Sequence, residues 1–190
     1  MRTLLIYIFA IFLFSCQEKL DRNIEPITRK ESIPSDYNPQ AKLQELNISL
    51  KNPGTPVANY VHAVRTGNLI FLAGKGPKKD DGKNIVGKLG ADLTIEEGYE
   101  AARWAGINQL AVLQAELGNL NKVKQIVKVK GVVNAIPEFS DQSKVINGYS
   151  DLMVKVFGER GKHARAAVGM GSLPGNMAVE VEMVVEVFED

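Results

Sequence analysis

The residue whose type and setting best suit chemistry is Arg165, which lies in the run His163–Met170. Ala164, Ala166 and Ala167 flank it, so there is room for a ligand beside its guanidinium. The planar guanidinium presents two parallel N–H donors that match a carboxylate. Arg165 is therefore a candidate anchor for a small acid, although residue types alone favour an ordinary ion pair with a glutamate of the same sheet.

Other chemical signatures are missing from the sequence. We find no metal-ligand spacing and no Ser/His/Asp elbow, and the glycines of residues 74–90 are spaced as in a loop that closes a cleft, not as in a nucleotide fingerprint. The 23 Lys and Arg residues nearly balance the 22 Asp and Glu residues, which leaves a formal net charge of +1. We therefore expect no metal, no cofactor and no general attraction to nucleic acid.

The N-terminus has the layout of an export signal. The apolar run 4–14 follows Arg2 and is too short for a comfortable membrane-spanning helix. The next residues complete Leu13-Phe14-Ser15-Cys16, which resembles the bacterial lipobox, in which the cysteine is acylated. Cys16 is the only cysteine, so no intrachain disulfide is possible. We expect residues 1–15 to be a lipoprotein signal peptide and Cys16 to be lipidated; a simple cleaved signal peptide is the alternative.

The rest of the chain divides into a tether and one domain. Residues 16–39 are charged, contain Pro26 and Pro34 and show no sustained apolar period, which is typical of a flexible linker. Residues 40–190 are long enough for a single globular domain with a core. The mature protein is thus expected to be exported and anchored to a membrane, at the periplasmic face or the cell surface.

Apolar periodicity and turn residues predict the elements that must position Arg165. The expected order is a short helix, two strands, a long helix, a strand, a second helix and two strands. Thr94 and Glu97 form a capping box before the long helix, and Gly118 ends it. The expected ranges are a helix at 40–50, a hairpin at 60–64 and 69–73, a helix from 94 to 118, a strand at 123–133, a helix from about 140 to 158, and strands at 163–170 and 178–188. This pattern predicts an α+β fold with both helices on one face of a sheet.

The last strand raises a question about the other face of this sheet. Val179, Val181, Met183, Val185 and Val187 alternate with Glu180, Glu182 and Glu186, so the glutamates should lie opposite the helices. The second strand, residues 69–73, is apolar without alternation, which predicts that both of its faces are covered. Either an oligomer covers the glutamate-bearing face, or the last strand lies at a sheet edge with its glutamates in water.

Four segments, in order, carry a resemblance to a known family. They are ANYVHAVRTGNLIFLAGKGP (58–77), VKVKGVVNA (127–135), KVINGYSDL (144–152) and HARAAVGMGSLPGNMAVEVE (163–182). From about residue 41 to 189 the chain resembles the RidA family, also called YjgF-type or L-PSP endoribonuclease-like. The resemblance implies a chorismate-mutase-like fold and a homotrimer.

The resemblance also implies an activity and a site. Members of the family hydrolyse reactive enamines and imines, such as 2-aminoacrylate and 2-iminopropionate, to 2-keto acids and ammonia without a cofactor. Arg165 would then bind the substrate carboxylate and Glu180 would position the attacking water as a general base. The substrate-binding positions implied by the match are Tyr60, Gly74, Asn147 and Ala167.

The sequence departs from the family pattern near this site. Many members have Ser, often followed by Cys, where this chain has Ala166 and Ala167, and a common Ser-Gly-Gln is here Ala73-Gly74-Lys75. An export signal also separates the protein from the cytoplasmic enzymes that generate 2-aminoacrylate. A non-catalytic trimer that binds a small carboxylate or a partner is therefore a second hypothesis. An endoribonuclease that uses Lys122, Lys124, Lys128 and Lys130 with His62 or His163 is a third.

Overall fold

The computed structural model describes residues 32–189 of the chain, and the predicted signal segment and Cys16 lie outside this range. Within it the helices are α1 (Pro39–Glu45), α2 (Ile95–Leu117) and α3 (Gln142–Phe157), with short 3-10 turns at Leu120–Lys122, Gly158–Gly161 and Pro174–Asn176. The strands are β1 (Ala63–Thr66), β2 (Leu69–Lys75), β3 (Val123–Asn134), β4 (Ala164–Met170) and β5 (Val179–Val187). No helix in residues 32–189 has the length and apolar character needed to span a bilayer.

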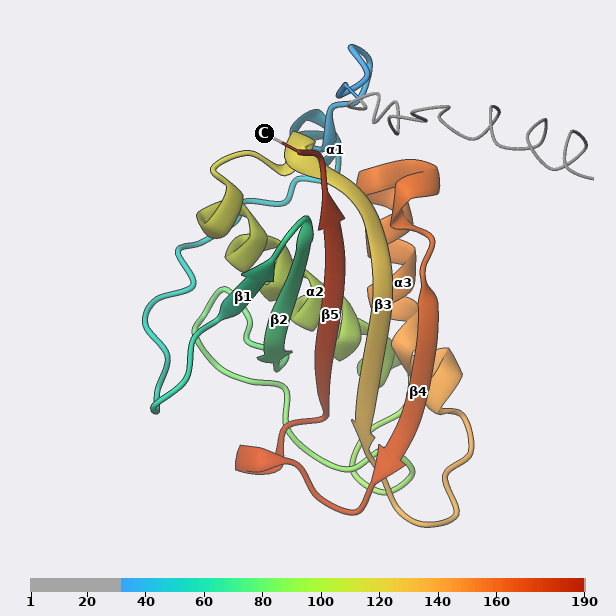
Figure 1. The fold of residues 1–190 in the computed structure, drawn as a ribbon. Coiled ribbons are helices and arrows are strands. Elements are labelled where there is room, and N and C mark those ends of the chain that lie inside the picture. The colour runs from blue at the N-terminus through green and yellow to red at the C-terminus, as the bar shows by residue number, and fades with distance from the viewer. Residues whose placement is uncertain (1–31, 190) are drawn as a thin grey trace, which may run out of the picture. The chain divides into compact units, whose positions relative to one another are not determined.

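The strands form one five-stranded sheet in the order β1-β2-β5-β3-β4 (Figure 1). All neighbours are antiparallel except β3 and β4, which are parallel. β5 is therefore the central strand, and the alternative in which it lies at a sheet edge is wrong. β3 is interior as well, so the lysines it carries do not mark an edge strand.

Helices α2 and α3 lie side by side behind the sheet and cover one of its faces (Figure 1), as predicted. Thr94 and Glu97 form the expected capping box at the start of α2, and Gly118 adopts a left-handed conformation at its end. The apolar residues of α2, α3 and β5 meet between the layers, where Val181 and Val185 have no exposed surface. This α+β arrangement matches the predicted fold class.

Among residues 32–189, nothing covers the opposite face of the sheet (Figure 1). On β2, Ile70 and Leu72 are buried under the helices, whereas Phe71 is 46% exposed. Its partner on β1, Val64, is 56% exposed, and Val168 on β4 is 40% exposed. The prediction that both faces of β2 are covered thus fails for a single chain, because α2 and α3 pack on one face only.

Three local features differ from the sequence-based expectations. β1 begins at Ala63, not at Tyr60, and Tyr60 lies in the preceding loop. A register shift near Val127 interrupts the alternation that a regular strand at 123–133 would have, so Val127 is exposed while Ile126 and Val129 are buried. Tyr37, which falls in the predicted tether, donates a hydrogen bond from its hydroxyl to the Val123 carbonyl at 2.8 Å, so the end of that segment contacts the domain.

Candidate functional site

Glu180 lies at the start of β5, next to an irregularity in β2. Between Leu72 and Lys75 the pairing of β2 with β5 shifts, because three steps along β2 match two steps along β5. The Glu180 carboxylate passes over Gly74 in the space that a Cβ atom would occupy. Gly74 is therefore required for the position of the Glu180 carboxylate, and this close approach is the reason for a glycine here.

Glu180 differs from the other two glutamates on its face. Glu182 forms an ion pair with Lys130 at 3.5 Å, and Glu186 forms one with Lys124 at 3.0 Å. Glu180 instead lines a pocket of about 700 Å³ together with Tyr60 and Gly74. The residues Tyr60, Gly74 and Glu180 are called the glutamate half below.

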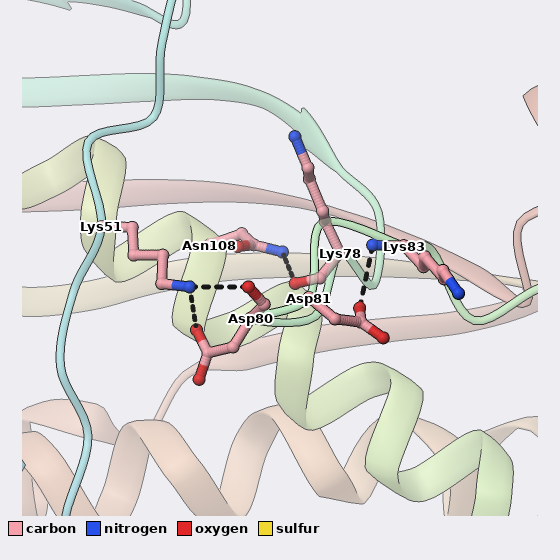
Figure 2. A network of polar contacts seen from close by, with 6 residues as sticks. All are labelled: Lys51, Lys78, Asp80, Asp81, Lys83 and Asn108. Atoms are coloured by element: carbon pink, nitrogen blue, oxygen red, sulfur yellow. Dashed lines mark hydrogen bonds and ion pairs between the residues drawn. The ribbon is translucent and has the colours of Figure 1, made fainter.

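The wall of this pocket is a loop at residues 76–84 that is held by polar contacts (Figure 2). Asn108 on α2 donates from Nδ2 to the carbonyl oxygens of Gly76 and Lys78, each at 3.0 Å. Lys51 donates from Nζ to the Asp80 carbonyl at 2.7 Å and pairs with the Asp80 carboxylate at 3.0 Å. The loop is thereby fixed against both α2 and the segment that precedes β1.

Gln109, also on α2, holds the irregular part of β2 from beneath. Its side chain is fully buried, and its Nε2 donates to the Ala73 carbonyl at 3.1 Å and to the Val181 carbonyl at 2.7 Å. These two carbonyls belong to the neighbours of Gly74 and Glu180. Sequence reasoning missed Gln109, although a lone amide within the apolar stripe of an amphipathic helix was a detectable signal.

Replacement of Gln109 with leucine is expected to lower the free energy of unfolding by about 2–4 kcal/mol. The variant leaves the Ala73 and Val181 carbonyls without their side-chain donor in a buried setting. Urea unfolding followed by circular dichroism measures the change. The same substitution at Gln114, which is only partly buried on the same helix, should cost less than about 1 kcal/mol, and equal losses at the two positions would contradict this role for Gln109.

Arg165 lies elsewhere, where the edge strand β4 meets α3. Its Nη1 donates to Asn147 Oδ1 at 2.9 Å and to Ser150 Oγ at 3.0 Å. Among the described residues, the polar contacts of Arg165 are thus with α3. The expectation that Arg165 forms an ordinary ion pair with a sheet glutamate is therefore wrong. Ala167 lies two residues further along β4 and packs against the core on the same face. Arg165, Asn147 and Ala167 are called the arginine half.

A short hydrogen-bond chain orients Arg165. Ser150 Oγ lies 3.0 Å from His163 Nε2, and His163 Nδ1 lies 2.7 Å from the Gly161 carbonyl. Because a carbonyl only accepts, Nδ1 carries the proton, and neutral His163 accepts from the Ser150 hydroxyl through Nε2. Burial lowers the pKa of His163. The hydrogen bond to the Gly161 carbonyl partly raises this pKa again, and the charge of Arg165 lowers it further. His163 is therefore a neutral support of the arginine half.

This pKa shift predicts a pH-dependent stability. Because the folded pKa lies below the ordinary value of 6.5, neutral His163 contributes stability that is complete above that value and is lost as the pH falls through the folded pKa. The difference in unfolding free energy between the wild type and His163→Asn should therefore shrink as the pH is lowered below about 6.5. Urea titrations from neutral to mildly acidic pH measure it; a difference that is constant over this range would contradict the prediction.

The two halves of the site lie on opposite faces of the sheet. Arg165 pairs with Val129 of β3, whereas Glu180 pairs with Val132. Side chains alternate along a strand, so positions three apart face opposite ways. Val129 lies under the helices, and Glu180 is on the uncovered side. One chain therefore does not bring Arg165 and Glu180 together.

Two lysines of the ribonuclease hypothesis form ion pairs, and its two histidines lie in different parts of the domain. Lys124 and Lys130 are paired with glutamates of β5, and His163 supports Arg165 from a half-buried position. His62 lies in the pocket of the glutamate half, next to Lys75. Within residues 32–189, no three His, Cys, Asp or Glu side chains are grouped so as to hold a metal ion.

The chain is a small α+β protein of the chorismate-mutase-like class. The features that define this class are a five-stranded sheet with two helices on one face, a carboxylate over a strand glycine and an arginine on the edge strand. Residues 41–187 match the family model described as "YjgF/chorismate_mutase-like, putative endoribonuclease". The chain belongs to this family, the YjgF/RidA family.

Relatives from several organisms agree with this membership. Protein TCP17 from Trypanosoma cruzi is 46% identical over 147 residues, which cover 77% of this chain and 92% of the relative. A crystal structure of a protein of unknown function from Agrobacterium tumefaciens is 40% identical with a TM-score of 0.72, covering 78% of this chain and 93% of that one. A crystal structure described as that of "a putative endoribonuclease" from Shewanella oneidensis is 32% identical with a TM-score of 0.76, covering 79% of this chain and 99% of that one.

Proposed function

We propose that the protein hydrolyses a small imine or enamine that bears a carboxylate, such as 2-iminopropionate, to a 2-keto acid and ammonia. Arg165 binds the carboxylate, and Glu180 takes a proton from the water that attacks the imine carbon. Tyr60 and Gly74 line the cleft beside Glu180, and Asn147 and Ala167 lie beside Arg165. No cofactor takes part in this scheme.

The observation that carries the proposal is the division of the site into two incomplete halves. The glutamate half lies on the uncovered face of the sheet and the arginine half lies at its β4 edge. Exposed Phe71, Val64 and Val168 on the uncovered face are apolar surface that a second copy of the chain would bury. We propose that a homotrimer joins the arginine half of one copy to the glutamate half of the next.

Cell location is part of the same proposal. The segment before Cys16 has the layout of a lipoprotein signal, so we propose an exported protein anchored by lipid at Cys16. Three anchors per trimer would hold the assembly to a membrane more firmly than one. The substrate would then be an imine present outside the cytoplasm.

The test is hydrolysis of 2-iminopropionate that an amino-acid oxidase generates from alanine. Purified protein is expected to release pyruvate faster than the uncatalysed reaction and to have a trimeric mass by light scattering at micromolar concentration. Release at the uncatalysed rate, together with saturable binding of pyruvate, would replace the enzyme with the carboxylate-binding alternative. A monomeric mass would remove the shared site.

A further inference from the structure

The pocket of the glutamate half contains an amine that the proposed hydrolysis does not use. Lys75 is the last residue of β2, directly after Gly74, and its half-buried side chain lines the pocket with Glu180. Its Nζ lies 2.7 Å from Nδ1 of His62, which lines the same pocket. An amine, an imidazole and a carboxylate therefore share one cavity of about 700 Å³.

The hydrogen bonds of His62 decide how it interacts with Lys75. His62 Nε2 lies 3.2 Å from the Gly54 carbonyl, which only accepts, so Nε2 carries the ring proton. Nδ1 is then left with a lone pair directed at Lys75 Nζ. In this tautomer His62 is an acceptor for a proton from Lys75, as a general base beside a nucleophile must be.

The surroundings of Lys75 also lower its pKa. Burial lowers the pKa of the Lys75 ammonium, and the charge of nearby Glu180 opposes this shift only in part. Two other lysines of the pocket are engaged with carboxylates, since Lys51 pairs with Asp80 and Lys79 pairs with Asp81. A lysine that is partly withdrawn from water and placed beside a base is the usual form of a nucleophilic amine.

We propose that Lys75 is a nucleophile that forms an imine with the carbonyl or imine carbon of a small 2-oxo or 2-imino acid. The choice of this substrate class rests on the proposed function. The neutral Nζ attacks the carbon of the protonated substrate imine (C=NH2+), and the C=N electron pair moves to the substrate nitrogen. His62 accepts a proton from Nζ and passes it to that nitrogen, which departs as ammonia and leaves a protonated imine on Lys75. Water, deprotonated by Glu180, adds to the carbon. The proton of the new hydroxyl group moves to Nζ as the bond between carbon and Nζ breaks, which releases the 2-oxo acid and the free amine, and Glu180 gives its proton to solvent.

Reductive trapping of the full chain with pyruvate and sodium borohydride tests the proposal without requiring turnover. Pyruvate forms the same imine by loss of water, and borohydride reduces it to a stable amine. We expect an adduct that fragment-ion sequencing places at Lys75 with at least about tenfold preference over Lys78 or Lys79, which line the same pocket. Lys75→Gln should abolish the adduct and retain the fold by circular dichroism, whereas Lys79→Arg should trap like the wild type.

The role of His62 gives a second measurement. His62→Gln retains a polar side chain but is a poor base, so the initial rate of trapping at Lys75 should fall about tenfold or more. Absence of an adduct, or equal labelling of Lys75, Lys78 and Lys79, would overturn the proposal. Hydrolysis of 2-iminopropionate by Lys75→Gln at the wild-type rate would also overturn the proposal. That result would leave the roles of Arg165 and Glu180 intact. Conversely, selective trapping at Lys75 in a protein that does not accelerate hydrolysis would support the nucleophile and refute only the proposed function.

Discussion

Arg165→Ala is expected to lower kcat/KM for 2-iminopropionate by about 100-fold or more, because the substrate carboxylate loses its charged anchor. Arg165→Lys should fall between this variant and the wild type, since it keeps the charge but not the planar set of donors, of which Nη1 contacts both Asn147 and Ser150. The measurement is pyruvate release over a range of imine concentrations.

A matched control for Arg165 is available on α2. Arg103 is a surface residue that forms an ion pair with Glu100 at 3.3 Å and lies outside both halves of the site. Arg103→Ala should leave kcat/KM unchanged. If Arg165→Ala were as active as Arg103→Ala, Arg165 would not bind the substrate.

Glu180→Gln is expected to lower kcat by about 10²–10⁴-fold, since the amide is nearly isosteric but does not accept the proton of the attacking water. Glu182→Gln is the control, because Glu182 is on the same face of β5 but pairs with Lys130. Comparable losses in the two variants would indicate a general effect of charge on this face and would contradict a specific role for Glu180.

The position of the Glu180 carboxylate should matter as much as its charge. A methyl group at Gly74 would occupy the space of that carboxylate, which is the flexible end of a side chain and is able to move away. Gly74→Ala should therefore lose activity while its melting temperature changes little. Full activity in this variant would show that the observed carboxylate position is not needed.

The two inactive variants also test whether the site is shared between copies. A trimer that contains both Arg165→Ala and Glu180→Gln chains would have some interfaces with an intact arginine from one copy and an intact glutamate from the next. Random mixing by co-expression should restore about one quarter of the wild-type activity. No recovery in mixed trimers would mean that both residues act within one copy, which conflicts with their separation across the sheet.

Much of the fold was predictable from local signals. Thr94, Glu97 and Gly118 set the ends of α2 through backbone capping, which depends only on nearby residues. The alternation of valine and glutamate along β5 correctly assigned its two faces, because the strand period is two. Both the helix positions and the covered face followed from these patterns.

Strand order and pocket composition were not available from local patterns. β5 lies at the centre of the sheet because it pairs with both β2 and β3, and such long-range pairing leaves no trace in the glutamates that suggested an edge. The contact of Gln109 with the irregular part of β2 likewise joins residues 36 positions apart, and that of Lys75 with His62 joins the two sides of a hairpin, 13 positions apart. Sequence reasoning named Lys75 only as a departure from the family pattern.

By itself, therefore, the sequence determined the fold class, the ends of α2 and α3 and the residue types of the candidate site, because these depend on short-range periodicity and on side-chain chemistry. Only the tertiary structure decided that Arg165 faces α3, on the side of the sheet opposite to Glu180, since the register of β3 with both its neighbours relates the two positions. The same register is the physical reason why a complete site requires a second copy of the chain under the proposed function.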